Sequence, residues 1–115
     1  MAGEIEFDSI ESAIEDIKEG RIVVVADDED RENEGDFVMA AEKVTPEAVN
    51  LMAKYGRGLI CVPITRQKAY SLDLDYMVTE RADPDEAALT ASVDHADLRT
   101  TSISAPSRST TMTEL

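Results

Sequence analysis

Two apolar runs near the start of the chain are separated by the segment Asp27-Asp28-Glu29-Asp30-Arg31-Glu32-Asn33-Glu34-Gly35-Asp36. The run before it, residues 21–26, is β-branched and lacks polar alternation, which is typical of a strand buried on both faces. The run after it starts at Asp36 and continues through residues 37–41, so a second strand is expected there. The acidic segment is therefore predicted to connect two strands.

Seven of these ten residues are carboxylates and a single one is basic. If the segment is ordered, so much like charge needs either full solvation or a hard cation, and carboxylate oxygens are the ligands that magnesium and calcium prefer. Because side chains two residues apart share one face of an extended chain, Glu32, Glu34 and Asp36 are predicted to converge. Gly35 would allow a tight turn or the close approach of a ligand.

Two other interpretations of the acidic segment stay open. Read from Asp30, it resembles a calcium-binding EF-hand loop with acids at its first, third and fifth positions and glycine at its sixth. The twelfth position is Ala41 instead of the expected bidentate glutamate, and strands, not helices, are expected on either side. The other interpretation is a disordered acidic surface loop, which composition by itself favours.

Composition narrows the class of protein. The chain has 115 residues, of which 43% are apolar, and fits one domain. Its formal charge of −14 would repel phosphate backbones and anionic lipids, so neither nucleic acid nor membrane is an expected partner. A single cysteine, Cys61, cannot form an internal disulfide, and no signal peptide or membrane span is recognised. We expect a soluble, cytoplasmic protein.

Helices and strands are predicted to alternate along the rest of the chain. A helix is expected over residues 9–19, opened by a capping box from Asp8 to Glu11 and ended by Gly20. Further predicted elements are a helix from Thr45-Pro46 to Gly56, a strand over 58–63, a helix over 66–72 capped by Thr65, a loop over 80–87, a strand over 89–93 and a helix from Ala105 capped by Ser104. This pattern predicts an α/β fold, arranged as an α+β sandwich in which a mixed sheet has flanking helices, apparently truncated.

The acidic segment, DDEDRENEGD directly after an apolar strand, resembles the signature of the 3,4-dihydroxy-2-butanone 4-phosphate synthase family. Other stretches agree with that family in order and spacing: the first helix with Arg-Ile-Val-Val-Val from residue 21, residues 55–61, residues 100–105 and residues 107–111. The similarity covers nearly all of the chain. Residues 1–115 are thus identified as the N-terminal part of a single domain of this family.

The resemblance implies an enzyme of riboflavin biosynthesis. Members are magnesium-dependent, or manganese-dependent, lyases that convert D-ribulose 5-phosphate to L-3,4-dihydroxy-2-butanone 4-phosphate and formate. Their site lies at a dimer interface, so a homodimer is expected of the full-length protein. The expected small-molecule partner is the sugar phosphate.

Roles for individual residues follow from matching positions. Glu32 matches the family's magnesium-ligating glutamate, and Arg31, Glu32 and Asp36 match positions that contact the sugar phosphate. Glu34 and Asp36, close to the ion and to each other, are expected to titrate together and to act as acid and base.

The other matched positions lie further along the chain. Cys61 matches a cysteine near the substrate, which gives it a candidate catalytic role, although a small buried residue in a strand is the simpler interpretation. Thr90, Thr101 and Arg108 match regions that wall the pocket, although hydroxyls often only cap turns and helices. His95 matches no essential histidine and is interpreted as an exposed residue beside a turn.

Some features depart from the family pattern. The second magnesium ligand, a histidine in an Arg-x-x-His-Thr motif, would lie beyond Leu115, and members are about twice as long. Ser102 stands where glycine is usual, Pro106-Ser107 replaces Ala-Asp, and residues 83–89 replace a loop that contacts substrate. Three hypotheses follow: a fragment of a true synthase, a truncated non-catalytic paralogue, or an acidic module that binds divalent cations.

Overall fold

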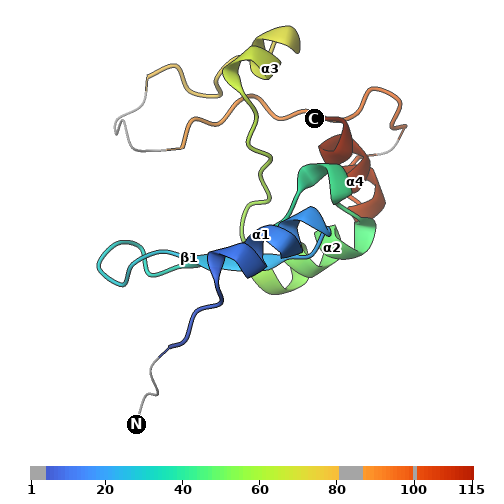
Figure 1. Cartoon of the computed structure of the whole chain (residues 1–115). Helices are drawn as coiled ribbons and strands as arrows, with labels where there is room; N and C mark the ends of the chain where they lie inside the picture. The colour runs from blue at the N-terminus through green and yellow to red at the C-terminus, as the bar shows by residue number, and fades with distance from the viewer. Residues whose placement is uncertain (1–4, 81–86, 100) are drawn as a thin grey trace.

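Residues 5–80, 87–99 and 101–115 are described by the computed structural model (Figure 1). Its elements are α1 (Ile10–Lys18), β1 (Val23–Ala26), β2 (Gly35–Val38), the 3-10 turn η1 (Ala41–Lys43), α2 (Pro46–Leu51), the π-helical turn η2 (Met52–Gly56), α3 (Arg66–Ser71) and α4 (Ala105–Glu114). Helices thus accompany a small antiparallel sheet, which confirms an α+β fold. None of the described helices is both long and apolar enough to cross a membrane.

The two strands on either side of the acidic segment form an antiparallel hairpin. The register pairs Val23 with Val38 at one end and Ala26 with Gly35 at the other. Both predicted strands are confirmed, although the second ends at Val38 because the chain then turns into η1. Within the described ranges the sheet consists of this antiparallel pair, so the parallel pairing that a mixed sheet requires is not seen there.

The first strand is not buried on both faces, contrary to the prediction. Val24 is 66% exposed and Val25 is 53% exposed. Helix α1 packs beside β1 and η2 packs beside β2, but the described residues leave Val24 and Val25 largely uncovered. The β-branched residues of this strand therefore form an apolar face that is exposed in this chain.

Each of the four α-helices that the structure describes begins after a hydroxyl residue. Each hydroxyl accepts a hydrogen bond from the backbone N–H three residues later, which satisfies one of the free donors of a first turn; these residues are Ser9, Thr45, Thr65 and Ser104. The predicted starts at Thr45, Thr65 and Ser104 are confirmed. The capping box at Asp8 is wrong, because the Ser9 hydroxyl accepts the N–H of Ser12 at 3.1 Å instead.

Two glycines shape the first half of the chain. Gly20 ends α1 with a φ of +78°, and the N–H groups of Gly20 and Arg21 donate to the carbonyls of Ile17 and Asp16, which is a Schellman motif. Gly56 lies so close to Phe37 of β2 that an added Cβ would be 3.2 Å from the ring. The helix that contains Gly56 ends one residue later, at Arg57, with a φ of +58°.

The strands predicted over 58–63 and 89–93 do not form ladders. Residues 59–65 run without regular structure from η2 to α3, as Figure 1 shows, and the second segment makes one isolated bridge, between Thr90 and Tyr76. A strand needs a neighbour for its backbone N–H and C=O groups, and no described segment lies alongside 58–63 in a ladder. Residues 81–86, which make up most of the predicted 80–87 loop and of the 83–89 replacement, lie outside the described residues.

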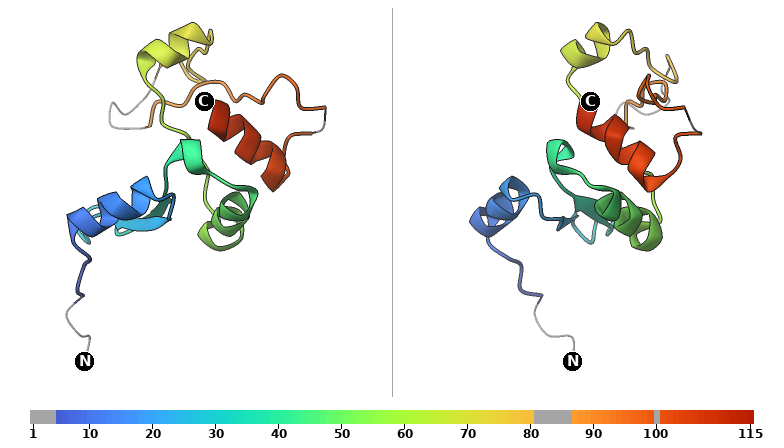
Figure 2. Two further views of the ribbon diagram at one scale, coloured as in Figure 1. Left: turned by 45° about the vertical axis from the view of Figure 1, so that its right-hand side comes forward. Right: turned by 90° about the vertical axis from the view of Figure 1, so that its right-hand side faces the viewer.

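The packed centre of the molecule is small. Helices α2 and α4 lie against each other (Figure 2), and Val49 of α2 is the one described hydrophobic residue that is buried. Helix α4 contains two buried polar residues, Ser107 and Ser109. The accessible surface is 9677 Å², whereas a compact monomer of 12.6 kDa exposes about 6,200 Å². The radius of gyration is 16.3 Å, against about 13 Å for a compact chain of this length.

Candidate functional site

The acidic loop between β1 and β2 is organised by the carboxylate of Asp27. One oxygen, Oδ1, accepts the N–H of Glu34 at 2.9 Å, and the other, Oδ2, accepts the N–H of Glu32 at 3.0 Å. Oδ2 also accepts Nη1 of Arg31 at 3.0 Å. These bonds stabilise the ionised form, so the backbone N–H of Glu34 above all holds the pKa of Asp27 below its usual range.

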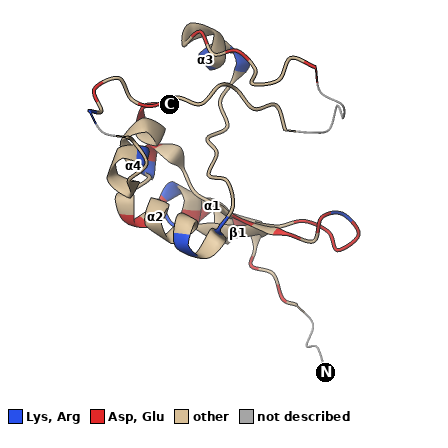
Figure 3. Ribbon diagram, turned by 180° about the vertical axis from the view of Figure 1, so that it is seen from behind, with Lys and Arg blue, Asp and Glu red and all other residues tan. Residues whose placement is uncertain are grey.

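The loop has a defined turn structure. The Asp28 carbonyl accepts the N–H groups of Arg31 at 3.0 Å and Asn33 at 3.3 Å, and the Asp28 side chain accepts the N–H of Asp30 at 2.8 Å. Figure 3 shows the loop as a mostly red segment that extends away from the helices. This network argues against a disordered acidic loop, and the flanking antiparallel strands argue against an EF-hand.

The predicted convergence of Glu32, Glu34 and Asp36 is wrong. Among the described residues no group of three or more acidic, histidine or cysteine side chains is placed to hold a metal ion. The prediction assumed an extended chain, but Asn33 has a φ of +51°, which puts a turn between Glu32 and Glu34. The alternation of faces is therefore interrupted inside the loop.

Glu32 and Arg31 are the exposed charged pair of the loop. Their side chains are 59% and 68% exposed, and Nη2 of Arg31 lies 3.1 Å from Oε1 of Glu32. Magnesium in proteins usually keeps several waters and takes one or two carboxylates together with substrate oxygens. One accessible carboxylate fits such a site in part, since the described residues include no group of three or more ligands around it.

Asp36 and Cys61 line the same cleft. This cleft has a volume of about 890 Å³ and lies between β2, η2 and the extended segment 58–63. Its walls are mainly apolar, with Phe37, Met52 and Tyr55 among them. Cys61 is exposed and lies outside any strand, so the interpretation as a buried strand residue is wrong for this chain.

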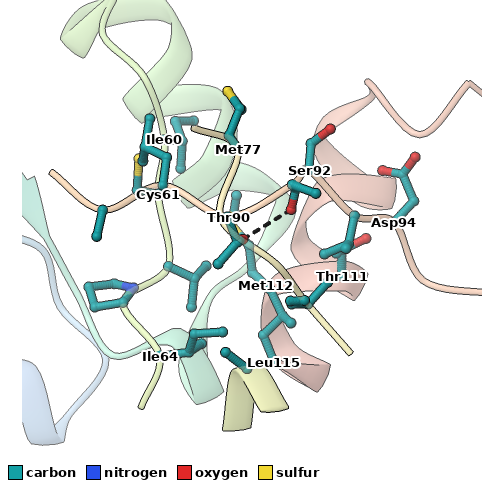
Figure 4. A pocket seen from close by; sticks show the side chains of 18 of the residues that line it. Ile60, Cys61, Ile64, Met77, Thr90, Ser92, Asp94, Thr111, Met112 and Leu115 are labelled. Atoms are coloured by element: carbon teal, nitrogen blue, oxygen red, sulfur yellow. Dashed lines mark hydrogen bonds between the residues drawn. The ribbon is translucent and has the colours of Figure 1, made fainter. Parts of the chain in front are cut away.

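Cys61 also lines a second cleft, of about 860 Å³, with Thr90 and Arg108. Figure 4 shows Thr90 among the labelled side chains, with Cys61 to one side and Asp94 to the other. The Thr90 hydroxyl donates to the Ala91 carbonyl at 3.0 Å. Cys61 thus belongs to the segment, residues 59–63, that lines both clefts.

The predicted site residues consequently occupy separate regions. Arg31, Glu32 and Glu34 belong to the loop and line neither cleft, and Thr101 lines neither cleft. His95 lies beside a turn as expected, but it is half-buried and not exposed. Its N–H donates to the Thr111 hydroxyl at 3.1 Å, and its Nδ1 accepts the N–H of Asp97 at 3.2 Å.

Asp27 is the functional candidate that the sequence interpretation missed. It was counted among the seven carboxylates of the loop without a role of its own. A usable signal was present, since aspartate at the start of a turn often accepts backbone N–H groups from residues that follow. Its position directly after β1 places it at the base of the hairpin.

Comparisons with known proteins agree with one another. The model of the 3,4-dihydroxy-2-butanone 4-phosphate synthase family matches residues 11–115. The riboflavin biosynthesis protein RibBA of Bacillus mycoides (strain KBAB4) is 52% identical over 109 residues, which are 95% of this chain and 27% of that protein. The chain thus spans about a quarter of the length of the curated relatives that it matches.

Solved structures show the same relationship. A 3,4-dihydroxy-2-butanone 4-phosphate synthase in complex with two magnesium ions matches with a TM-score of 0.85 at 46% identity, over 93% of this chain and 50% of that one. The synthase of Candida albicans matches with a TM-score of 0.80 at 41% identity, over 93% of this chain and 52% of that one. The chain belongs to the 3,4-dihydroxy-2-butanone 4-phosphate synthase family.

Proposed function

We propose that the full-length protein containing this chain is a 3,4-dihydroxy-2-butanone 4-phosphate synthase of riboflavin biosynthesis. The observation that carries this proposal is the family match over residues 11–115, which includes the loop with Arg31, Glu32, Glu34 and Asp36 all present. The reaction would convert ribulose 5-phosphate to the four-carbon phosphate and formate. The atoms of the two products add up to those of the substrate, so this lyase needs no oxidant or co-substrate.

Glu32 is the proposed ligand of a divalent ion, magnesium or manganese. Its carboxylate is accessible, and a related synthase has been solved with two magnesium ions. When bound, such an ion would polarise a carbonyl of the substrate and stabilise the negative charge that develops as a neighbouring proton is removed. Arg31 beside it supplies a guanidinium, which suits the phosphate or an anionic oxygen of the substrate.

Glu34 and Asp36 are the proposed acid and base. One carboxylate removes a proton from the carbon next to the carbonyl, the electrons of the broken C–H bond move toward the carbonyl carbon, and the carbonyl π pair moves to oxygen. The other carboxyl group, in its protonated form, donates a proton at a later step of the reaction. Asp36 and Cys61 share a cleft in this chain, which supports a role for Cys61 at the same site.

Thr90, Thr101 and Arg108 are proposed substrate-binding residues. Thr90 and Arg108 line one cleft and offer a hydroxyl and a guanidinium to an anionic polyol. We also propose that the full-length protein is a cytoplasmic homodimer, with further copies or segments covering the exposed apolar surface described above. A simple cation-binding module is less well supported, because the loop carboxylates are not gathered into a three-ligand group in the described residues.

Calorimetric titration of the full-length protein tests this proposal. Ribulose 5-phosphate is expected to bind saturably to the protein chelated with EDTA, and magnesium added afterwards is expected to give a continuing heat of reaction, because the ion and Glu32 would hold substrate oxygens during turnover. Calcium titrated alone serves as the comparison. Tight calcium binding without any sugar-phosphate binding would contradict the proposal and favour the cation-binding module.

A further inference from the structure

Asp27 makes more hydrogen bonds to the acidic loop than any other side chain that the structure describes there. Its two oxygens accept the N–H of Glu34 at 2.9 Å, the N–H of Glu32 at 3.0 Å and Nη1 of Arg31 at 3.0 Å. Its own N–H donates to the Glu34 carbonyl at 3.3 Å. A single residue therefore restrains the backbone at Glu32 and Glu34 and the side chain of Arg31.

Asp27 is less exposed than the two charged residues, Arg31 and Glu32, that are accessible to a ligand. The Asp27 side chain is 20% exposed, whereas those of Arg31 and Glu32 are 68% and 59% exposed. Asp27 directly follows β1, so it starts from a strand whose backbone is paired with β2. Asp27 thus links the paired strands of the hairpin to the exposed charged pair, Arg31 and Glu32.

We infer that Asp27 is a positioning residue for Arg31 and Glu32. It acts through them, setting the direction in which their side chains leave the loop, and it contacts neither substrate nor metal itself. This inference rests on the proposed function, which makes Glu32 a metal ligand and Arg31 a substrate contact. Residues that orient metal ligands affect metal affinity and activity, because a ligand must point at the ion in order to bind it.

The chemistry of the side chain explains why a carboxylate is needed. Two oxygens with no hydrogens accept all three donors at once. An asparagine at this position would keep one accepting oxygen, and its NH₂ group would face an N–H or the Arg31 guanidinium. Asp27→Asn therefore removes at least one of the three bonds while keeping the size of the side chain.

Asp28 offers a matched control. Its Oδ1 accepts the N–H of Asp30 at 2.8 Å, a bond that the asparagine oxygen of Asp28→Asn can keep. The two variants make the same chemical change, remove the same charge and lie next to each other in the same loop. They differ in whether the replaced carboxylate holds Glu32, Glu34 and Arg31.

The first readout is turnover of ribulose 5-phosphate by the full-length protein as magnesium is varied. In Asp27→Asn, we expect the magnesium concentration for half-maximal turnover to rise roughly 10- to 100-fold, the range for groups that orient metal ligands. In Asp28→Asn, the magnesium concentration for half-maximal turnover should stay within about twofold of the wild-type value, because this residue does not hold Arg31 or Glu32. A normal magnesium requirement in Asp27→Asn, or an equal loss in Asp28→Asn, would overturn the inference.

The second readout does not depend on activity. Amide hydrogen exchange, followed by NMR in the metal-free full-length protein, should be about tenfold faster in Asp27→Asn at either Glu32 or Glu34, whichever N–H faces the new NH₂ group, as expected for the loss of one hydrogen bond. Exchange in Asp28→Asn should match the wild type. Unchanged exchange in Asp27→Asn overturns the inference, whereas a wild-type protein without turnover overturns the proposed function and leaves this readout to decide the role of Asp27.

Discussion

Glu32→Gln in the full-length protein is expected to lower turnover of ribulose 5-phosphate roughly 100-fold or more, because a neutral amide replaces a carboxylate ligand of a hard cation. Glutamine has nearly the same shape as glutamate, so the loop should keep its fold. The N–H of residue 32 would still donate to Asp27, since that bond uses the backbone. The measurement is initial rate against magnesium concentration, with formate as the detected product.

Glu42→Gln is the matched control for this prediction. Glu42 is an exposed residue of η1, outside the acidic loop and both clefts, and the same amide change there removes the same charge. Its turnover should equal that of the wild type. Full turnover by Glu32→Gln, at an unchanged magnesium requirement, would show that Glu32 is not the ligand.

The second large effect is expected when residues 1–115 are expressed by themselves. This chain should fail to turn over ribulose 5-phosphate, should self-associate, and should raise the fluorescence of a hydrophobic dye several-fold above that of the full-length protein. The physical reason is the surface: 9677 Å² is accessible, and Val49 is the one buried hydrophobic residue in the described part of the chain. Apolar side chains such as Leu59 and Ile103, 77% and 74% exposed, need cover.

This chain matches about half of the length of a related synthase. Light scattering after gel filtration, with dye fluorescence at equal concentration, would measure the effect. The full-length protein treated in the same way is the control. A monomeric, dye-free 115-residue chain with a sharp thermal transition would contradict this prediction.

Local features of the fold were predictable from the sequence because local chemistry decides them. Thr45, Thr65 and Ser104 begin helices since their hydroxyls accept N–H groups three residues later. Gly20 ends α1 because glycine adopts a positive φ without strain. The hairpin follows from two apolar runs around a polar turn, and its strands were placed to within a few residues.

Long-range features could not be predicted in the same way. The runs over 58–63 and 89–93 have the composition of strands, but a strand also needs a partner, and the described chain supplies one bridge at Thr90 and no ladder for 58–63. The predicted burial of Val24 and Val25 is wrong for the same reason. An apolar residue is buried only if another segment packs over it, and the local sequence does not specify that segment.

Some features of the candidate site were predictable from the sequence and others were not. The loop, its charge and its place between two strands were predicted, and the cleft residues Cys61, Thr90 and Arg108 do line cavities. The geometry inside the loop was not predicted, because Asn33 takes a left-handed conformation that breaks the assumed alternation. A turn of that kind also lets Asp27 reach the N–H groups of both Glu32 and Glu34.

The most direct test of the central claim is to incubate the full-length protein with ribulose 5-phosphate and magnesium and to follow the products by NMR. We expect equal amounts of formate and 3,4-dihydroxy-2-butanone 4-phosphate, formed without added co-substrate, and we expect EDTA to stop the reaction. A folded, magnesium-loaded protein that leaves ribulose 5-phosphate unchanged, or consumes it without releasing formate, would contradict the proposed function.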